Sequence, residues 1–184
     1  MVLGFAILLL IAGGLVFLAV MYNSLVGLRV RADSAWSDID VQLKRRHDLI
    51  PNLVETVKGY AGHEKSTFEN VTKYRSMAMQ ATGTAERAQA EGQLTMALKS
   101  LFAVAENYPQ LRASENFSSL QKSLAEIEDN LQNARRYYNA VVRDLNTTIQ
   151  SFPSNLVAGM FGFQPRAFFE LDAAAEREAP AVKF

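Results

Sequence analysis

Residues 2–21 read VLGFAILLLIAGGLVFLAVM, and this stretch decides how the rest of the chain is organised. It contains no charged and no strongly polar side chain. Twenty helical residues span about 30 Å, which matches the hydrocarbon core of a bilayer. Because hydrocarbon offers no hydrogen-bond partners, the backbone of such a segment closes its hydrogen bonds within a helix. The sequence therefore predicts a transmembrane anchor over residues 1–21.

A cleaved signal peptide is the alternative interpretation of this stretch. Signal peptides carry positive residues before a shorter apolar core, and small residues before the cleavage site. No Lys or Arg precedes the apolar residues, and cuts after Ala19 or Ser24 would place the bulky Phe17 or Tyr22 three positions before the cut. We therefore expect the anchor to be retained.

The charges that follow the anchor predict its orientation. Arg29 and Arg31 lie just after it, and positive residues favour the cytoplasmic side of a membrane. We expect the N-terminus outside and the domain in the cytoplasm, with the lipid bilayer as a partner.

Composition and motifs limit the chemistry that the chain offers. Nineteen basic and nineteen acidic residues cancel, so we expect no nucleic-acid partner. The chain lacks cysteine, and Lys44 and Tyr60 stand where a Glu-x-x-His metal motif ending at His47 or His63 needs glutamate. It also lacks Gly-x-Ser-x-Gly, P-loop and His-Glu-x-x-His motifs. We predict no metal, no cofactor, no catalytic residues and no enzymatic activity.

Beyond Met21, apolar residues recur at steps of three and four, the spacing of one face of an amphipathic helix. Breaks near residues 51, 81–84 and 108–109 divide this pattern into four helices. The fold class we predict is all-α, with a single N-terminal transmembrane helix continuing into a long antiparallel four-helix bundle over residues 22–153. The last helix carries a heptad stripe that we expect in the core: Phe117, Leu120, Leu124, Ile127, Leu131, Tyr138 and Leu145.

Pro51 marks the first break. Proline lacks an amide donor and disfavours helical geometry at Ile50, and Asp48 is able to cap a new helix. We expect a turn at this point, with a kink inside one longer helix as the alternative.

Residues 154–184 form an apolar C-terminal segment followed by a tail. The segment has no sustained period, and we expect it to pack over one end of the bundle. The alternative is an apolar patch for a partner or the membrane interface. Residues 172–184 are rich in alanine and charge, and we expect them to be loose. The candidate partner or self-association surface is Met160, Phe161, Phe163, Phe168 and Phe169.

Lys44, Arg45 and Arg46 form a second candidate surface. Such a run is usually the solvated end of a helix, and its functional interpretation is contact with anionic lipid or an acidic partner. About 22 helical residues place it roughly 33 Å from the membrane end, several Debye lengths away. An acidic protein partner therefore fits better than lipid.

Several motifs resemble those of the LemA family of bacterial membrane proteins. They are Tyr22–Asn23, Ala35–Trp36, IDVQLKRR at residues 39–46, DLIPNL at 48–53, ENF at 115–117, ARRYYN at 134–139 and FPSN at 152–155. The resemblance covers nearly the whole chain. It implies one membrane helix in the bacterial inner membrane and a long four-helix bundle, and it implies no reaction.

Two classes of function follow. The first is a non-enzymatic scaffold that self-associates as a homo-oligomer or binds another membrane protein. The alternative is a ligand-sensing or enzymatic domain with an unrecognised site in the bundle or under residues 161–169. The anchor offers Gly13 and Gly14 for close helix approach but lacks Gly-x-x-x-Gly, so the C-terminal segment is the stronger reason to expect oligomers.

Overall fold

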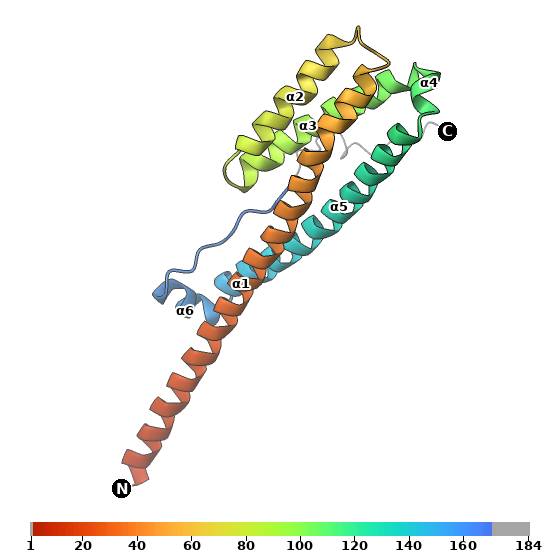
Figure 1. The fold of residues 1–184 in the computed structure, drawn as a ribbon. Helices are drawn as coiled ribbons and strands as arrows, with labels where there is room; N and C mark the ends of the chain where they lie inside the picture. Colours follow the sequence, from red (N-terminus) through yellow and green to blue (C-terminus); the bar gives the residue numbers. More distant parts are fainter. Residues whose placement is uncertain (1, 171–184) are drawn as a thin grey trace, which may run out of the picture. The chain divides into compact units, whose positions relative to one another are not determined.

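A computed structural model describes residues 2–170 of the chain. The helices follow one another as α1 (Val2–Lys58), α2 (Lys65–Gln80), α3 (Thr84–Glu106), α4 (Pro109–Arg112), α5 (Glu115–Gln150) and α6 (Ser154–Met160) (Figure 1). Residues 2–170 contain no strand, so the predicted all-α class is confirmed. The tail expected to be loose, residues 172–184, lies outside the described residues.

The described residues form two compact units. The first unit comprises residues 2–38 and 136–167, and the second comprises residues 39–135 and 168–170. Both α1 and α5 contribute to each unit, because the boundary falls inside these two helices. Residues 22–153, expected as one bundle, therefore divide between the two units.

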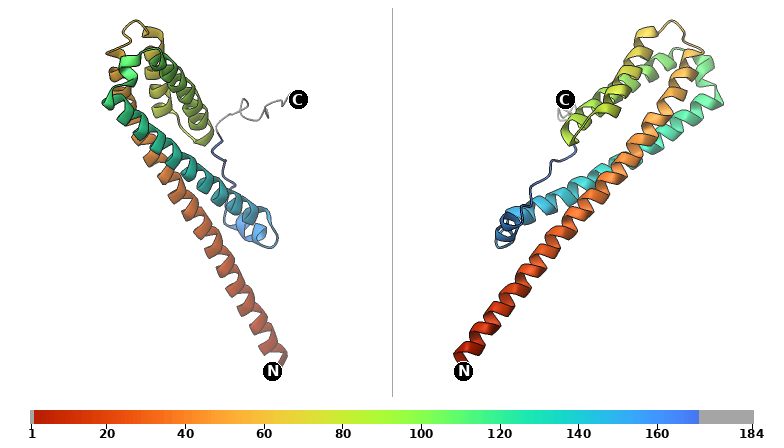
Figure 2. Two further views of the ribbon diagram at one scale, coloured as in Figure 1. Left: turned by 90° about the vertical axis from the view of Figure 1, so that its right-hand side faces the viewer. Right: turned by 60° about the vertical axis from the view of Figure 1, so that its left-hand side comes forward.

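The second unit is a helical bundle in which segments of α1, α2, α3 and α5 share one apolar core. Figure 2 shows α2 and α3 side by side, joined by a short turn at Gly83. The φ of Gly83 is 83°, a left-handed conformation that glycine adopts without strain. An apolar N-terminal helix thus continues into a helical bundle, as predicted. The core includes Leu53 and Val57 of α1, Phe68 and Val71 of α2, Leu94 and Leu101 of α3, and Phe117 and Leu124 of α5.

The heptad stripe of α5 is buried at every seventh residue. Leu120 and Ile127, at the alternate heptad position, are partly exposed. The row of residues spaced by seven from Phe117 therefore faces the core, and Leu120 and Ile127 lie at its margin. The buried members are Phe117, Leu124, Leu131, Tyr138 and Leu145.

The turn expected at Pro51 is wrong, because Pro51 lies inside α1, which continues to Lys58. A proline here removes the amide that would donate to the His47 carbonyl one turn earlier. Arg75 of α2 replaces that donor: its Nε lies 2.7 Å from the His47 carbonyl oxygen. The chain reverses instead at residues 59–64, a stretch that contains two glycines.

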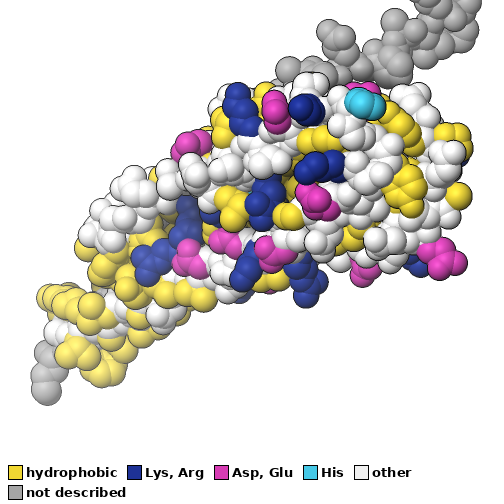
Figure 3. Space-filling view, turned by 45° about the horizontal axis from the view of Figure 1, so that its top comes forward, with side chains coloured by type: hydrophobic (Ala, Val, Ile, Leu, Met, Phe, Trp, Pro, Cys, Tyr) yellow, Lys and Arg dark blue, Asp and Glu magenta, His cyan; other side chains and the backbone are white. Residues whose placement is uncertain are grey.

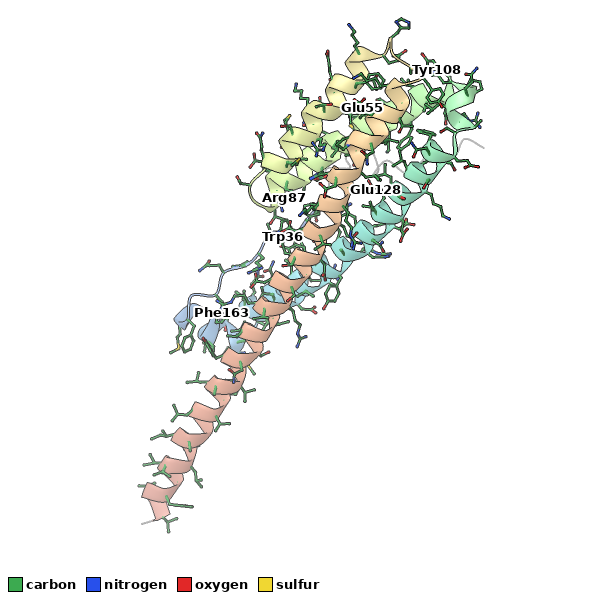
Figure 4. All side chains as sticks on the ribbon, viewed as in Figure 1. Trp36, Glu55, Arg87, Tyr108, Glu128 and Phe163 are labelled. Atoms are coloured by element: carbon green, nitrogen blue, oxygen red, sulfur yellow. The ribbon has the colours of Figure 1, made fainter. Side chains whose placement is uncertain are left out.

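In the first unit, α1 changes from exposed to packed along its length. Of the described residues, only α1 contains a stretch long and apolar enough to cross a membrane, at its N-terminal end. Figure 3 shows hydrophobic side chains gathered at this end. Leu25, Ala32 and Ala35 are fully buried, and the ring of Trp36 lies 5.3 Å from that of Tyr138 on α5 (Figure 4).

Candidate functional site

Arg46, His47, Glu91 and Glu128 form a charge cluster inside the second unit. Arg46 and Glu91 are each 1% exposed. Arg46 Nη1 donates to Glu91 Oε2 at 2.8 Å, and Arg46 Nε lies 2.7 Å from Glu128 Oε1. His47 Nε2 lies 2.7 Å from the second Glu91 oxygen, Oε1. The Glu91 carboxylate on α3 therefore joins two neighbouring side chains of α1. Glu128, labelled on α5 in Figure 4, adds a contact from a third helix.

The remaining guanidinium nitrogen of Arg46 is also engaged. Its Nη2 donates to Thr95 Oγ1 at 2.7 Å, and Thr95 Oγ1 lies 2.9 Å from the backbone carbonyl oxygen of Glu91. A buried charge is tolerated only when it is paired and hydrogen-bonded. The Arg46 guanidinium is hydrogen-bonded through Nη1 and Nη2, whereas its Nε lies at ion-pair distance from Glu128 without forming a hydrogen bond.

Burial also changes the acidity of Glu128. It raises the pKa of this carboxyl because desolvation penalises the charged form. The nearby Arg46 charge opposes that increase, while the Glu91 charge adds to it. Folding therefore favours the protonated form of Glu128 more than the unfolded chain does.

Arg46 and Glu91 occupy core positions of their helices. The buried stripe on α1 runs Ile39, Leu43, Arg46, Ile50 and Leu53, at steps of four and three. The buried stripe on α3 runs Glu91, Leu94, Leu98, Leu101 and Ala105, at steps of three and four. A charged residue in a core position is satisfied only where its partner faces it, so this pair favours one register of α1 against α3.

The basic run predicted as a contact for an acidic partner divides in the structure. Lys44 and Arg45 are exposed, whereas Arg46 is buried and paired with acidic residues of its own chain. The solvated position expected for Arg46 is wrong, because its place in the stripe turns it to the core. Sequence reasoning missed Glu91, although a carboxylate seven residues before Leu98 on an apolar stripe was a usable signal.

In the first unit, the segment after α6 packs on α1 through aromatic rings. The ring centroids of Phe161 and Phe163 lie 4.7 Å and 5.9 Å from that of Tyr22. The guanidinium carbon of Arg29 lies 5.4 Å from the centroid of Phe163, which is labelled in Figure 4. Phe163 is buried by these contacts, but Phe161 stays exposed.

Polar contacts fasten the same segment to α1 and α5. The side chain of Asn146 pairs with the backbone of Arg166, donating to its carbonyl and accepting from its amide, each at 2.8 Å. Arg166 Nη2 lies 2.6 Å from Asp33 Oδ1. The Tyr138 hydroxyl donates to the Ala167 carbonyl at 3.0 Å.

The five residues predicted as a partner surface therefore separate into two sets. Phe163 is buried in the first unit, and Phe169 is buried in the second, where the Arg135 guanidinium lies 5.5 Å from its ring centroid. Met160, Phe161 and Phe168 remain exposed. Within residues 2–170, no group of three or more His, Cys, Asp or Glu side chains is placed to hold a metal ion.

The described residues thus form an all-helical protein whose first helix begins with a stretch long and apolar enough to cross a membrane and continues into a bundle. Residues 35–184 match the family model described as the LemA family. The chain therefore belongs to the LemA family, and the resemblance seen in its motifs is confirmed.

The chain is also similar to named relatives. The chain is 25% identical over 185 aligned residues to magnetosome protein MamQ 2 of Paramagnetospirillum magneticum, covering 86% of this chain and 68% of the relative. Identity and coverage are the same for magnetosome protein MamQ of Magnetospirillum gryphiswaldense. Protein LemA of Metamycoplasma hominis is 26% identical over 152 residues, covering 80% of this chain and 68% of the relative.

Proposed function

We propose that this protein is a non-catalytic scaffold, anchored in the bacterial inner membrane by the start of α1. The observation that carries the proposal is the composition of α1. It begins with exposed apolar residues and continues, without a break, into residues packed in both units. A single helix of this kind couples a membrane anchor directly to a folded domain.

The use of charge in the structure supports a structural role. Arg46 pairs with Glu91, Arg87 with Asp40 and Arg166 with Asp33, and each pair joins two different segments of the chain. Each unit therefore uses some of its charged side chains for contacts within the chain.

Self-association through the anchor is part of the proposal. No residue outside the local backbone of α1 packs against Gly13 or Gly14, which leaves room there for a second helix. Small residues let transmembrane helices approach closely, and a membrane orients all copies alike, which favours cyclic closure. Because Phe163 and Phe169 pack on their own chain, we assign the contact between copies to the anchor rather than to the C-terminal segment.

A ligand-sensing or catalytic domain is the second candidate, and the buried charge cluster is the observation that favours it. The ionisable groups of the cluster already bind one another at 2.7–2.8 Å. A ligand at this place would have to displace those contacts, so the scaffold is the better-supported function.

Cross-linking in native membranes tests the self-association. We expect cross-linked oligomers for the wild-type chain and for the control Gly4→Leu, and a clear loss for the double variant Gly13→Leu/Gly14→Leu. Gly4 also lies in open space within the apolar helix, so this control adds the same side chain, once instead of twice, away from Gly13 and Gly14. A wild-type chain that stays monomeric at native abundance would refute this part of the proposal.

The proposed orientation, with the domain in the cytoplasm, is tested on intact spheroplasts. It is supported by Arg29 and Arg31, which follow the anchor and are exposed. Protease added outside should leave the domain uncut. Digestion of the domain would reverse the orientation, and a mature chain starting near Val20 would show that the anchor is removed.

A further inference from the structure

α6 and its flanking residues expose four large apolar side chains. Leu156 and Met160, four residues apart on α6, are 60% and 71% exposed. Phe152 before the helix is 81% exposed, and Phe161 after it is 55% exposed. These four residues are named the outer apolar face. The helix buries Ser154, Val157 and Ala158 against its own chain.

The chain around the outer apolar face carries no charge. From Ile149 to Pro165 there is no Asp, Glu, Lys or Arg, although about a fifth of the whole chain is charged. Charged side chains are costly in the apolar part of a membrane, and amphipathic segments that lie at its surface place apolar side chains among the acyl chains. An uncharged segment with four exposed apolar side chains suits that environment.

The position of α6 in the first unit brings the outer apolar face to the end of the anchor. The ring of Phe161 lies 4.7 Å from that of Tyr22, the residue directly after the apolar stretch 2–21. Tyrosine is enriched where a helix crosses the membrane–water boundary. Arg29, against the ring of Phe163, adds a positive charge nearby, where anionic headgroups are attractive partners.

We propose that the outer apolar face binds the surface of the lipid bilayer, with α6 in the headgroup region beside α1. The inference rests on the membrane anchoring of the proposed function and is independent of self-association. A second copy of the chain is the competing occupant. Lipid is favoured because the contact between Phe161 and Tyr22 holds the face beside the membrane in every molecule, whereas a second copy must first be encountered.

Fluorescence quenching on the full chain tests this inference. The chain has no cysteine, so Leu156→Cys and Met160→Cys each create a single site for an environment-sensitive fluorophore. Leu10→Cys marks the anchor, and Lys99→Cys, exposed on α3, is the control in water. The proteins are reconstituted in vesicles of phosphatidylcholine and phosphatidylglycerol. Lipids with a nitroxide at a shallow position test the labels on α6, lipids with a nitroxide deep in the acyl chain test the label at Leu10, and iodide reports contact with water.

We expect the labels at Leu156 and Met160 to emit at shorter wavelength than the label at Lys99. We also expect nitroxide lipids to quench them severalfold more strongly, and iodide to quench them less. A label at Leu156 that only iodide quenches, while the Leu10 label responds to nitroxide lipids, would overturn the inference and leave the anchor in place. Loss of lipid quenching at Leu10 as well would overturn both.

The competing occupant gives its own result. If a second copy covers the outer apolar face, the Leu156 label is shielded from iodide but not quenched by nitroxide lipids. That shielding disappears when the number of protein molecules per vesicle is lowered, whereas lipid contact is independent of protein density. Shielding that depends on protein density would overturn the inference in favour of an interface between copies.

Discussion

Glu91→Gln is the most informative single substitution in the charge cluster. It keeps the size of the side chain and removes its negative charge. In the wild-type chain the two Glu91 oxygens contact Arg46 Nη1 at 2.8 Å and His47 Nε2 at 2.7 Å. The amide retains one oxygen acceptor and presents a donor in place of the other, so one of these basic groups faces a donor.

The expected loss of stability follows from the burial of Arg46, whose side chain is 2% exposed. Removing one partner of a buried ion pair costs about 3–5 kcal/mol. Glu128 and Thr95 remain as partners of Arg46, which places the expected loss near the lower limit, at about 3 kcal/mol. A domain with a total stability of about 5–15 kcal/mol would lose a large share of it.

Asp40→Asn is the matched control. Asp40 pairs with Arg87, but these side chains are 45% and 25% exposed, and pairs in contact with water contribute only about 0–1 kcal/mol. Urea unfolding of the full chain in a non-ionic detergent, followed by helical circular dichroism, measures both variants. An equal loss of unfolding free energy in the two would refute the conclusion that the buried cluster stabilises the bundle more than the exposed pair does.

Three further outcomes are expected from the same unfolding assay. Leu131→Ala should cost about 2–5 kcal/mol, because Leu131 is buried on α5, whereas the exposed neighbour Gln132→Ala should change little. Arg75→Met should cost about 1–3 kcal/mol, because the His47 carbonyl, which has no helix donor at Pro51, would lose the Arg75 donor too. The cost should shrink in a Pro51→Ala background, where the amide of residue 51 again donates to this carbonyl. An unchanged cost in that background would contradict the role of Arg75 as the replacement donor. Burial raises the pKa of Glu128 above its ordinary value of 4.5, so folding favours the protonated carboxyl. The stability that protonated Glu128 contributes is therefore fully present below pH 4.5 and is lost as the pH rises through the pKa of the folded protein. Glu128→Gln should flatten the dependence of the midpoint on pH in that window, and a slope equal to that of the wild-type chain would show that another group causes it.

The features predictable from the sequence are those set by local patterns. The uncharged run 2–21 and the heptad stripe of α5 each repeat their signal over many residues, and both appear in the structure as helices. The turn near Gly83 is equally local, because only a few residues decide it. The small helices α4 and α6 have too few residues to show a period, and the sequence did not predict them.

The two errors both arise from contacts between residues far apart in the chain. The effect of Pro51 depends on a donor at Arg75, on a different helix, and no local pattern around residue 51 reveals it. The run at residues 44–46 has the composition of a solvated surface, but Arg46 pairs with Glu91 and Glu128 on two other helices. The positions of Arg46 and Glu91 on the apolar stripes of their helices predict burial better than the charge of residues 44–46 predicts exposure.

Arg75 makes the last two turns of α1 depend on the docking of α2. Residues 52–58 are too few to persist as an isolated helix, and the proline before them weakens their connection to the preceding turn. These turns therefore belong to the same cooperative folding step as α2. When α2 detaches, the His47 carbonyl at the start of these turns loses its donor, so the amides of residues 52–58 are expected to show the same protection against hydrogen exchange as those of α2.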